Sequence, residues 1–187
     1  MAFTGDSPKK KNERVEELIL SLSKGRATSM SALYDLIKTD IFAYALSKTS
    51  NKADAEDIMQ DTFVRIYQYA PQYTPKGKPL AWIFTIERNL IYRHFQKNSR
   101  VLRMGEEFGE LSDETDYEQG VVNGAFLAEL LRMLDYEERE IVTLHAVSGL
   151  KHREIAALMG KPLSTVLSKY NRAIKKMRFI EKEGKNE

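Results

Sequence analysis

The stretch GLKHREIAALMGKPLSTVLSKYNRAIKKMR, residues 149–178, contains a short helical pattern, a glycine and a longer helical pattern. Ala156, Gly160 and Val166 stand at the spacing of a helix-turn-helix. A small residue at 156 lets two helices cross closely, and Gly160 permits the positive φ of a tight turn. Val166 can fill the space under the second helix. The spacing therefore predicts a helix-turn-helix near the end of the chain.

The second helix of this unit has an apolar and a polar face. We expect one continuous buried face from Leu163, Val166, Leu167, Tyr170, Ile174 and Met177. The opposite face has hydroxyls near its start and cations farther along, which suits a helix in the DNA major groove. The candidate DNA-binding residues are Ser164, Thr165, Ser168, Lys169, Arg172, Lys175 and Lys176. The alternative is an αα-hairpin with a solubilising basic face.

Composition narrows the class of protein. A chain of 187 residues with 42% hydrophobic and 30% charged residues is typical of one or two folded domains. The absence of cysteine excludes a disulfide scaffold, a thiol nucleophile and a Cys-based zinc site. No apolar run approaches the roughly 20 residues of a membrane span, and the start lacks a signal-peptide pattern. We therefore expect a cytoplasmic protein with no membrane insertion, cofactor, metal or catalytic residue.

The net charge of +2 hides an uneven distribution. Residues 145–182 have nine Lys or Arg against two acids, and residues 80–103 have five against one. Residues 105–120 lie between these blocks and have seven acidic residues and no basic one. The pattern indicates two anion-binding surfaces and a tether, although solvated faces explain the charge alone equally well.

Helical periodicity predicts an all-α protein of two small helical domains joined by an acidic flexible linker. Polar and acidic residues in SNKADAED, residues 50–57, are a helix start signal, and the three prolines of residues 70–79 indicate a loop. The expected divisions are an N-terminal extension with a short helix (1–25), a first domain (26–98), a linker (99–122), a helix-turn-helix domain (123–182) and a tail (183–187).

The chain resembles the extracytoplasmic-function group of bacterial RNA polymerase sigma factors, in the sigma-70 family. The resemblance rests on three motifs in order: DAEDIMQDTFVRIY (54–67), PLAWIFTIERNLIYRHFQK (79–97) and LDYEEREIVTLHAVSGLKHREIA (134–156) followed by the helix-turn-helix. It implies a sigma region 2 bundle and a sigma region 4 helix-turn-helix. The implied function is to bind core RNA polymerase and direct promoter-specific transcription initiation, with no enzymatic activity.

One face of the 54–67 helix is the candidate polymerase-binding surface. Its residues are Asp57, Gln60, Asp61 and Arg65. Spacing by four places Asp57, Asp61 and Arg65 on one stripe. The resemblance implies that this stripe docks on the clamp coiled coil of the largest polymerase subunit. The alternative is a solvated face with an intrahelical ion pair.

The next loop and helix are the candidate surface for the minus-ten element. The residues are Tyr73, Lys76, Lys78, Arg88, Asn89, Tyr92 and Arg93. The resemblance implies that the loop captures a flipped base while the helix holds the unpaired strand. Aromatic stacking and phosphate neutralisation suit that role. The second domain, by the same resemblance, binds the minus-thirty-five element and the polymerase flap.

Some positions depart from the family pattern. Leu167 and Lys169 stand where arginine is frequent, so a bidentate contact to guanine is less available. Promoter preference therefore does not transfer from relatives. The resemblance also implies an anti-sigma factor as a partner. The acidic linker is either a plain spacer or, as the resemblance implies, threads polymerase near the nascent RNA.

Two other classes of function fit the sequence less well. A stand-alone helix-turn-helix regulator would bind DNA without polymerase, and the 54–67 and 79–97 motifs argue against it. An enzyme would have to use His94, His145 or His152, whose spacing matches no metal-binding motif.

Overall fold

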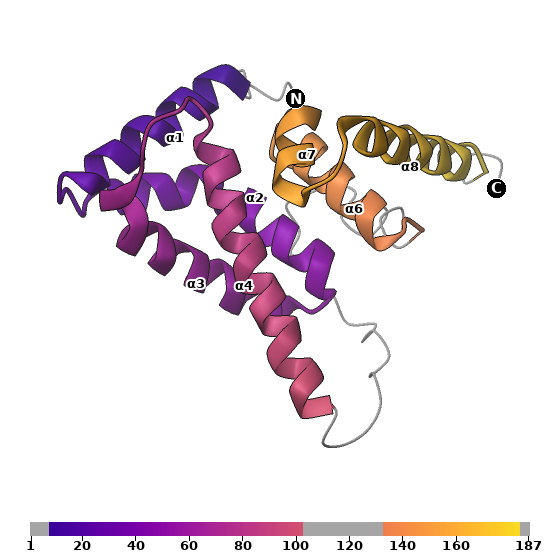
Figure 1. Cartoon of the computed structure of the whole chain (residues 1–187), viewed down its shortest axis with the longest axis horizontal. Helices are drawn as coiled ribbons and strands as arrows, with labels where there is room; N and C mark the ends of the chain where they lie inside the picture. Colours follow the sequence, from indigo (N-terminus) through magenta and orange to yellow (C-terminus); the bar gives the residue numbers. More distant parts are fainter. Residues whose placement is uncertain (1–7, 103–132, 184–187) are drawn as a thin grey trace.

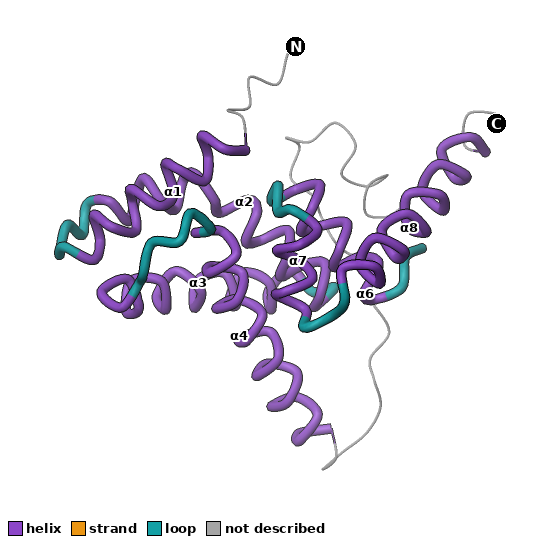
Figure 2. Tube along the Cα trace, turned by 45° about the horizontal axis from the view of Figure 1, so that its top comes forward, coloured by secondary structure: helices purple, strands orange, loops and turns teal. Residues whose placement is uncertain are grey.

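The computed structural model describes residues 8–102 and 133–183, with side chains described for 9–97 and 133–179. Within these ranges the regular structure is helical, and no strand occurs, so the predicted all-α fold is confirmed (Figures 1 and 2). In the same ranges, no helix combines the length and apolar character that crossing a membrane requires.

The first unit is a bundle of four helices around an aliphatic core. The helices are α1 (Pro8–Ser23), α2 (Ser29–Thr49), α3 (Lys52–Tyr69) and α4 (Pro79–Leu102), with a 3₁₀ turn at Ala70–Gln72 after α3. Each helix turns an apolar stripe inward, and Ile19, Ile37, Ile66 and Ile83 are fully buried. The outer faces of α3 and α4 remain available to solvent.

Local signals fix where the helices of this bundle begin and end. Ser50 has φ 53°, a left-handed conformation that ends α2. The Asn51 side chain then accepts the Asp54 N–H at 3.0 Å and caps α3, as the sequence predicted. At the far end, α4 is helical as far as Leu102, beyond residue 99 where the linker was expected to start. The rest of the expected linker and the first residues of the expected helix-turn-helix domain (123–132) lie outside the described residues.

The second unit is the helix-turn-helix with the helix that supports it. It comprises α6 (Tyr136–Val142), a π-helical turn (Thr143–Val147), α7 (His152–Met159) and α8 (Leu163–Glu183). Gly160 has φ 64° and ends α7, and the Lys161 N–H donates to the Ala156 carbonyl at 2.9 Å. Val166, on the inner side of α8, is fully buried. The predicted roles of Gly160 and Val166 are confirmed, and Ala156 is buried in the same cluster as Val166.

One residue that was predicted to lie on the buried face of α8 is exposed. Leu167 was expected in the buried face, but it is 39% exposed, so that expectation is wrong. A helix turns by about 100° per residue, and position 167 falls just beyond the stripe that Val166 centres. Leu167 instead lies at the edge of the polar face that carries Ser164 and Ser168, both exposed.

Three aromatic rings pack the space behind the turn. His145, His152 and Tyr170 have ring centroids 4.1, 5.0 and 4.6 Å apart. The Leu150 carbonyl lies 2.8 Å from His145 Nδ1 and can only accept, so Nδ1 carries the hydrogen. Desolvation and the neighbouring His145 lower the pKa of His152. The three rings therefore act as packing groups of the helix-turn-helix.

The two units pack against each other and share one hydrophobic cluster. This cluster joins Ile41 and Phe84 of the first unit to Ile141, Leu144 and Ile155 of the second. Helices α6 and α7 lie against α2 and α4 (Figures 1 and 2). The predicted domains therefore lie in contact, and this contact brings acidic residues of α6 near α4.

Candidate functional site

The outer face of α3 presents free acidic groups. Asp57, Gln60 and Asp61 are exposed, and neither carboxylate pairs with another described residue. Arg65 is half-buried and donates to Gln68 Oε1 at 3.0 Å, so the alternative ion pair with Asp61 is not formed. The cap at the start of α3 and its buried apolar face hold this stripe outward. The four predicted residues thus lie together on one accessible surface.

Exposed apolar side chains adjoin this stripe. Val64 is 53% exposed and Tyr67 52% exposed, and both lie on α3. Large exposed apolar groups beside unpaired charges are typical of a protein–protein contact. Neither residue was predicted to lie on this surface, although both fall in the 54–67 motif.

The loop between α3 and α4 is ordered by contacts at both of its ends. The Tyr73 ring packs on Trp82 with centroids 4.9 Å apart, and the Tyr73 hydroxyl donates to Glu16 Oε1 at 2.7 Å. Lys76 and Lys78 are exposed. Trp82 is half-buried and anchors the loop. Glu16 was not recognised from sequence, because it lies far from the loop along the chain.

The outer face of α4 carries the remaining candidate residues for the minus-ten element. Asn89, Tyr92 and Arg93 are exposed, and the Tyr92 side chain is the most open of the aromatic groups on α4. Arg88 is half-buried and its Nε lies 3.4 Å from Glu140 Oε1 of α6. On this face, Arg88 is therefore already paired with Glu140, whereas Arg93 is accessible.

Glu140 is the centre of a buried polar cluster between the two units. It accepts from the Tyr44 hydroxyl and from Lys48 Nζ, each at 2.7 Å, and the Lys48 ammonium lies 3.1 Å from the Tyr136 ring centroid. Burial lowers the pKa of Lys48 to about 8, against the opposing effect of Glu140. This cluster was missed from sequence because its partners are more than 90 residues apart.

The polar face of α8 contains the candidate residues for duplex DNA. Ser164 and Ser168 are exposed and Thr165 is half-buried. The three sit on the first turns of α8, on one side of the helix-turn-helix. The structure therefore brings the three predicted hydroxyls together.

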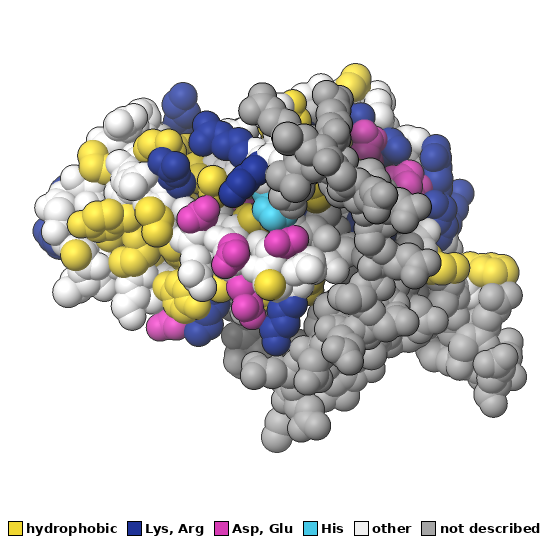
Figure 3. Space-filling view, turned by 90° about the horizontal axis from the view of Figure 1, so that it is seen from below, with side chains coloured by type: hydrophobic (Ala, Val, Ile, Leu, Met, Phe, Trp, Pro, Cys, Tyr) yellow, Lys and Arg dark blue, Asp and Glu magenta, His cyan; other side chains and the backbone are white. Residues whose placement is uncertain are grey.

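Acidic residues at the start of α6 engage most of the predicted cations of α8. Lys169 Nζ lies 3.2 Å from a Glu137 oxygen and 3.6 Å from an Asp135 oxygen. Lys176 Nζ lies 2.6 Å from Glu138 Oε2, with Arg172 at 3.9 Å from Oε1. Hydrogen bonds from Lys161 lower the pKa of Glu137, which keeps it charged. At the α8 end of the molecule, basic side chains lie beside acidic ones (Figure 3).

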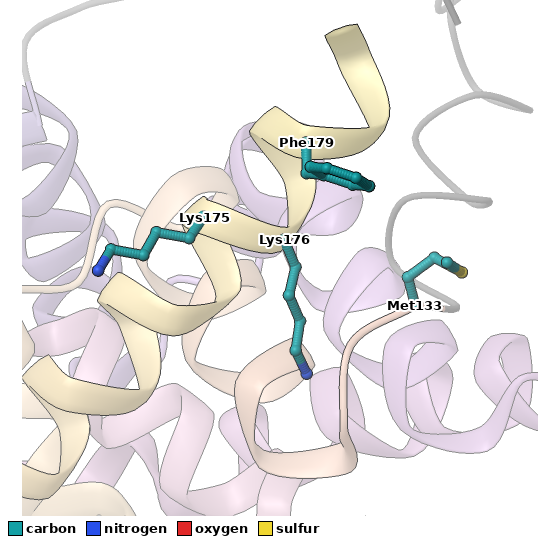
Figure 4. A pocket seen from close by; sticks show the side chains of 4 residues that line it. All are labelled: Met133, Lys175, Lys176 and Phe179. Carbon is teal, nitrogen blue, oxygen red and sulfur yellow. The ribbon is translucent and has the colours of Figure 1, made fainter. Parts of the chain in front are cut away.

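Lys175 differs from these neighbours. It is exposed and makes no ion pair with the residues that the structure describes. Figure 4 shows Lys176 directed toward α6 and Lys175 directed away from it. Beside them, Met133 and Phe179 line a shallow hollow with the two lysines. Of the four predicted cations of α8, Lys175 is therefore the one with no acidic partner among the described residues.

No group of three or more potential metal ligands occurs among the described residues. The surfaces found here are instead an acidic stripe, an aromatic and basic loop beside α4, and a basic helix with hydroxyls. These arrangements suit binding to protein and to nucleic acid.

Two family models match the chain in order. Sigma-70 region 2 matches residues 33–101, and Sigma-70 region 4 matches residues 127–177. The first covers α2 to α4 and leaves α1 outside the match, and the second covers the helix-turn-helix.

Curated proteins are similar over most of the chain. The ECF RNA polymerase sigma factor BldN of Streptomyces coelicolor is 31% identical over 170 residues, which is 87% of this chain and 64% of that protein. The chain thus matches less than two thirds of that relative's length. The ECF RNA polymerase sigma factor SigL of Mycobacterium tuberculosis is 29% identical over 161 residues, covering 84% of this chain and 91% of SigL.

Solved structures share the fold. The sigma factor RpoE in complex with the anti-sigma factor NepR from Bartonella quintana has a TM-score of 0.70 and 26% identity, covering 81% of this chain and 96% of RpoE. CnrH in complex with the cytosolic domain of CnrY has a TM-score of 0.64 at 22% identity, covering 92% and 98% of the two chains. The second likeness concerns the fold alone.

Proposed function

Because the chain belongs to the extracytoplasmic-function group of the sigma-70 family, we propose that it binds core RNA polymerase and selects promoters. The first unit would recognise and melt the minus-ten element, and the second would bind the minus-thirty-five element as duplex. The observation that carries the proposal is the order of surfaces along one chain: an acidic stripe on α3, an aromatic and basic loop before α4, and a basic helix-turn-helix.

The polymerase contact is assigned to the outer face of α3. Asp57 and Asp61 have no competing partner among the described residues, so binding does not first require an ion pair to break. Val64 and Tyr67 add exposed apolar area beside them. A charged stripe with an apolar border suits a helix-to-helix contact with the clamp coiled coil.

The single-stranded contact is assigned to residues 73–78 and the outer face of α4. Tyr73 and Tyr92 offer rings for base stacking, and Lys76, Lys78 and Arg93 offer charges for phosphates. Stacking contributes about 1–3 kcal/mol per base. Arg88 would join this surface only after leaving Glu140.

The duplex contact is assigned to α8. Ser164, Thr165 and Ser168 lie on its first turns, where side chains of a recognition helix reach base edges. Leu167, which is exposed beside them, adds an apolar group that suits a thymine methyl. Lys175 and Arg172 lie farther along, where phosphates are expected.

Further partners follow from the family. The polymerase flap is proposed to contact the second unit, and an anti-sigma factor to hold the chain inactive. The similar RpoE structure contains the anti-sigma factor NepR as its partner. We assign the chain to the cytoplasm, where polymerase and promoters are found.

Transcription from a random promoter library with bacterial core polymerase tests the proposal. We expect the wild-type chain to direct initiation at promoters that share two elements. The double variant Asp57→Lys, Asp61→Lys should lose more than about 90% of this activity, because two reversed charges repel the docking surface. Unchanged circular dichroism shows that the variant is folded.

Two results would contradict the proposal. The first is a wild-type chain that redirects polymerase to no start site. The second is a chain that binds duplex DNA tightly but does not associate with polymerase, which would indicate a stand-alone regulator.

A further inference from the structure

Helix α1 touches the loop proposed to receive an unpaired base. The first family match begins at residue 33, so α1 (Pro8–Ser23) lies outside it. Figure 1 shows the connection between α3 and α4 passing over α1, and α1 contacts both the 3₁₀ turn and α4. The function proposed above assigns no role to this helix.

One carboxylate oxygen of α1 ties together both ends of the loop. Glu16 Oε1 accepts the Tyr73 hydroxyl at 2.7 Å and the Gly77 backbone N–H at 3.1 Å. Gly77 has φ 66°, a conformation that residues other than glycine rarely adopt. The Glu16 contact therefore holds the chain in a turn that the backbone alone would leave mobile.

The Tyr73 hydroxyl keeps its proton and therefore remains a hydrogen-bond donor to Glu16. Burial raises the pKa of the Tyr73 hydroxyl, and its hydrogen bond to Glu16 raises it further. The ring also packs on Trp82 of α4. Tyr73 is thus fixed between α1 and α4, while Lys76 and Lys78 remain exposed on the loop.

We infer that Glu16 is a positioning residue that holds residues 73–78 in the shape that receives the unpaired strand. The inference rests on the proposed function, because it concerns the loop assigned to minus-ten DNA. A loop that is ordered before binding loses less conformational entropy when a base enters it. Glu16 acts through Tyr73 and Gly77 and itself needs no contact with DNA.

Four variants separate this role from a merely structural one. Glu16→Ala removes the acceptor, and Glu16→Gln keeps an acceptor oxygen of the same reach without its charge. Tyr73→Phe removes the hydroxyl and keeps the ring. Glu17→Ala is the matched control, because Glu17 lies on the same helix and is exposed, with an ion pair only to Arg14 among the described residues.

The first measurement follows the loop in the whole chain without DNA or polymerase. Trypsin can cleave after Lys76, whereas Lys78 is protected by the following proline at 79. Under native conditions, cleavage after Lys76 should be about tenfold faster in Glu16→Ala than in wild type. Glu16→Gln should stay within about threefold of wild type, and Glu17→Ala should not change the rate.

The second measurement follows promoter opening by the complex with core polymerase. The probe is a promoter selected from the library by the wild-type chain, and unpaired thymines are detected with permanganate. Glu16→Ala should slow opening about tenfold, and Tyr73→Phe should slow it less, because the Gly77 contact remains. Binding to polymerase should be equal in all variants.

The outcomes are distinguishable. Equal cleavage after Lys76 in Glu16→Ala and wild type would overturn the inference, since the loop would not depend on Glu16. Faster cleavage with unchanged opening would also overturn it and would leave Glu16 only a structural role. If the wild-type chain opens no promoter, the proposed function fails, whereas the cleavage result still decides whether Glu16 orders the loop.

Discussion

At the scale of single residues, Lys48 and Glu140 form a buried ion pair. Both side chains are almost fully buried, at 2% and 3% exposed, and they lie 2.7 Å apart. The Lys48 pKa is lowered mainly by burial, from 10.5 to about 8, so the folded chain releases this proton more readily than the unfolded chain. The effect gives stability a specific dependence on pH.

We expect the free energy of unfolding to rise between pH 8 and pH 10. In this window the folded chain loses the Lys48 proton while the unfolded chain, with a pKa of 10.5, retains it. The unfolded state then binds more protons, so stability increases with pH, by at most about 2 kcal/mol. Urea denaturation at several pH values measures this change.

A matched lysine separates Lys48 from other groups that titrate in this window. Lys48→Met should remove the rise, whereas Lys38→Met should preserve it, because the Lys38 side chain is 45% exposed and its partners, Asp35 and the Tyr34 ring, lie on the same helix. A wild-type stability that is flat or falls from pH 8 to pH 10 would contradict the assignment.

At the scale of elements, the cations of α8 differ in availability because α6 lies beside them. Lys169 has two acidic neighbours, and its side chain is 22% exposed. Lys175 is exposed and has no acidic neighbour among the described residues. From their positions along the helix alone, the two lysines would be expected to be equally available to a phosphate.

We therefore expect Lys175→Ala to weaken duplex binding more than Lys169→Ala. Losing a phosphate contact lowers the slope of log affinity against log salt by about 0.9. Lys175→Ala should show about this loss, and Lys169→Ala less, since Lys169 must first leave Glu137 and Asp135. Fluorescence anisotropy with a duplex of the selected minus-thirty-five sequence gives both slopes.

The control removes the charge of Glu137, which competes with phosphate for Lys169. Glu137→Gln should raise the affinity of the otherwise wild-type chain and increase the effect of Lys169→Ala. If Lys169→Ala instead lowers the slope as much as Lys175→Ala in the wild-type background, the ion pairs with α6 do not restrict this lysine.

The elements also show what the sequence could predict. The helix-turn-helix was predictable because Ala156, Gly160 and Val166 act within one short segment, where turn geometry and spacing determine the result. Leu167 was misplaced because it lies at the edge of a stripe, where spacing does not decide burial. The candidate surfaces for polymerase and duplex DNA were each predicted as one face of one helix, and the minus-ten surface as a loop with the helix that follows it.

Contacts between distant elements could not be predicted in this way. Glu16 meets Tyr73 across 57 positions, and Glu140 meets Lys48 across 92. In the helical patterns of the sequence, Glu16 and Glu140 occupy ordinary polar positions. Periodicity predicts which side of a helix faces inward, but it does not predict which other element that helix contacts. The neutralised state of Arg88 was missed for the same reason.

At the scale of the whole molecule, Glu140 links the two helical units. It joins α6 to Tyr44 and Lys48 of α2 and to Arg88 of α4. Without Glu140, the Lys48 ammonium would be buried and unpaired, and breaking a buried pair in this way costs about 3–5 kcal/mol. Separation of the units would relieve that cost, because Lys48 would reach water.

We expect Glu140→Ala to expand the molecule while its helices persist. Small-angle X-ray scattering should give a larger radius of gyration than wild type, and circular dichroism should be little changed. Glu137→Ala is the control, since Glu137 lies on the same helix and its described ion pairs are all within the second unit, with Lys161 and Lys169. An unchanged radius in folded Glu140→Ala would show that apolar packing alone holds the units together.

The acids of α6 have a consequence for the function proposed above. Four acids pair with cations of α8 and α4, as phosphates of DNA would. The acids are Asp135, Glu137, Glu138 and Glu140, and the cations are Lys169, Arg172, Lys176 and Arg88. We expect this internal competition to reduce trapping of the unassembled subunit on bulk chromosome. More of the chain would then stay free to reach polymerase, its proposed partner.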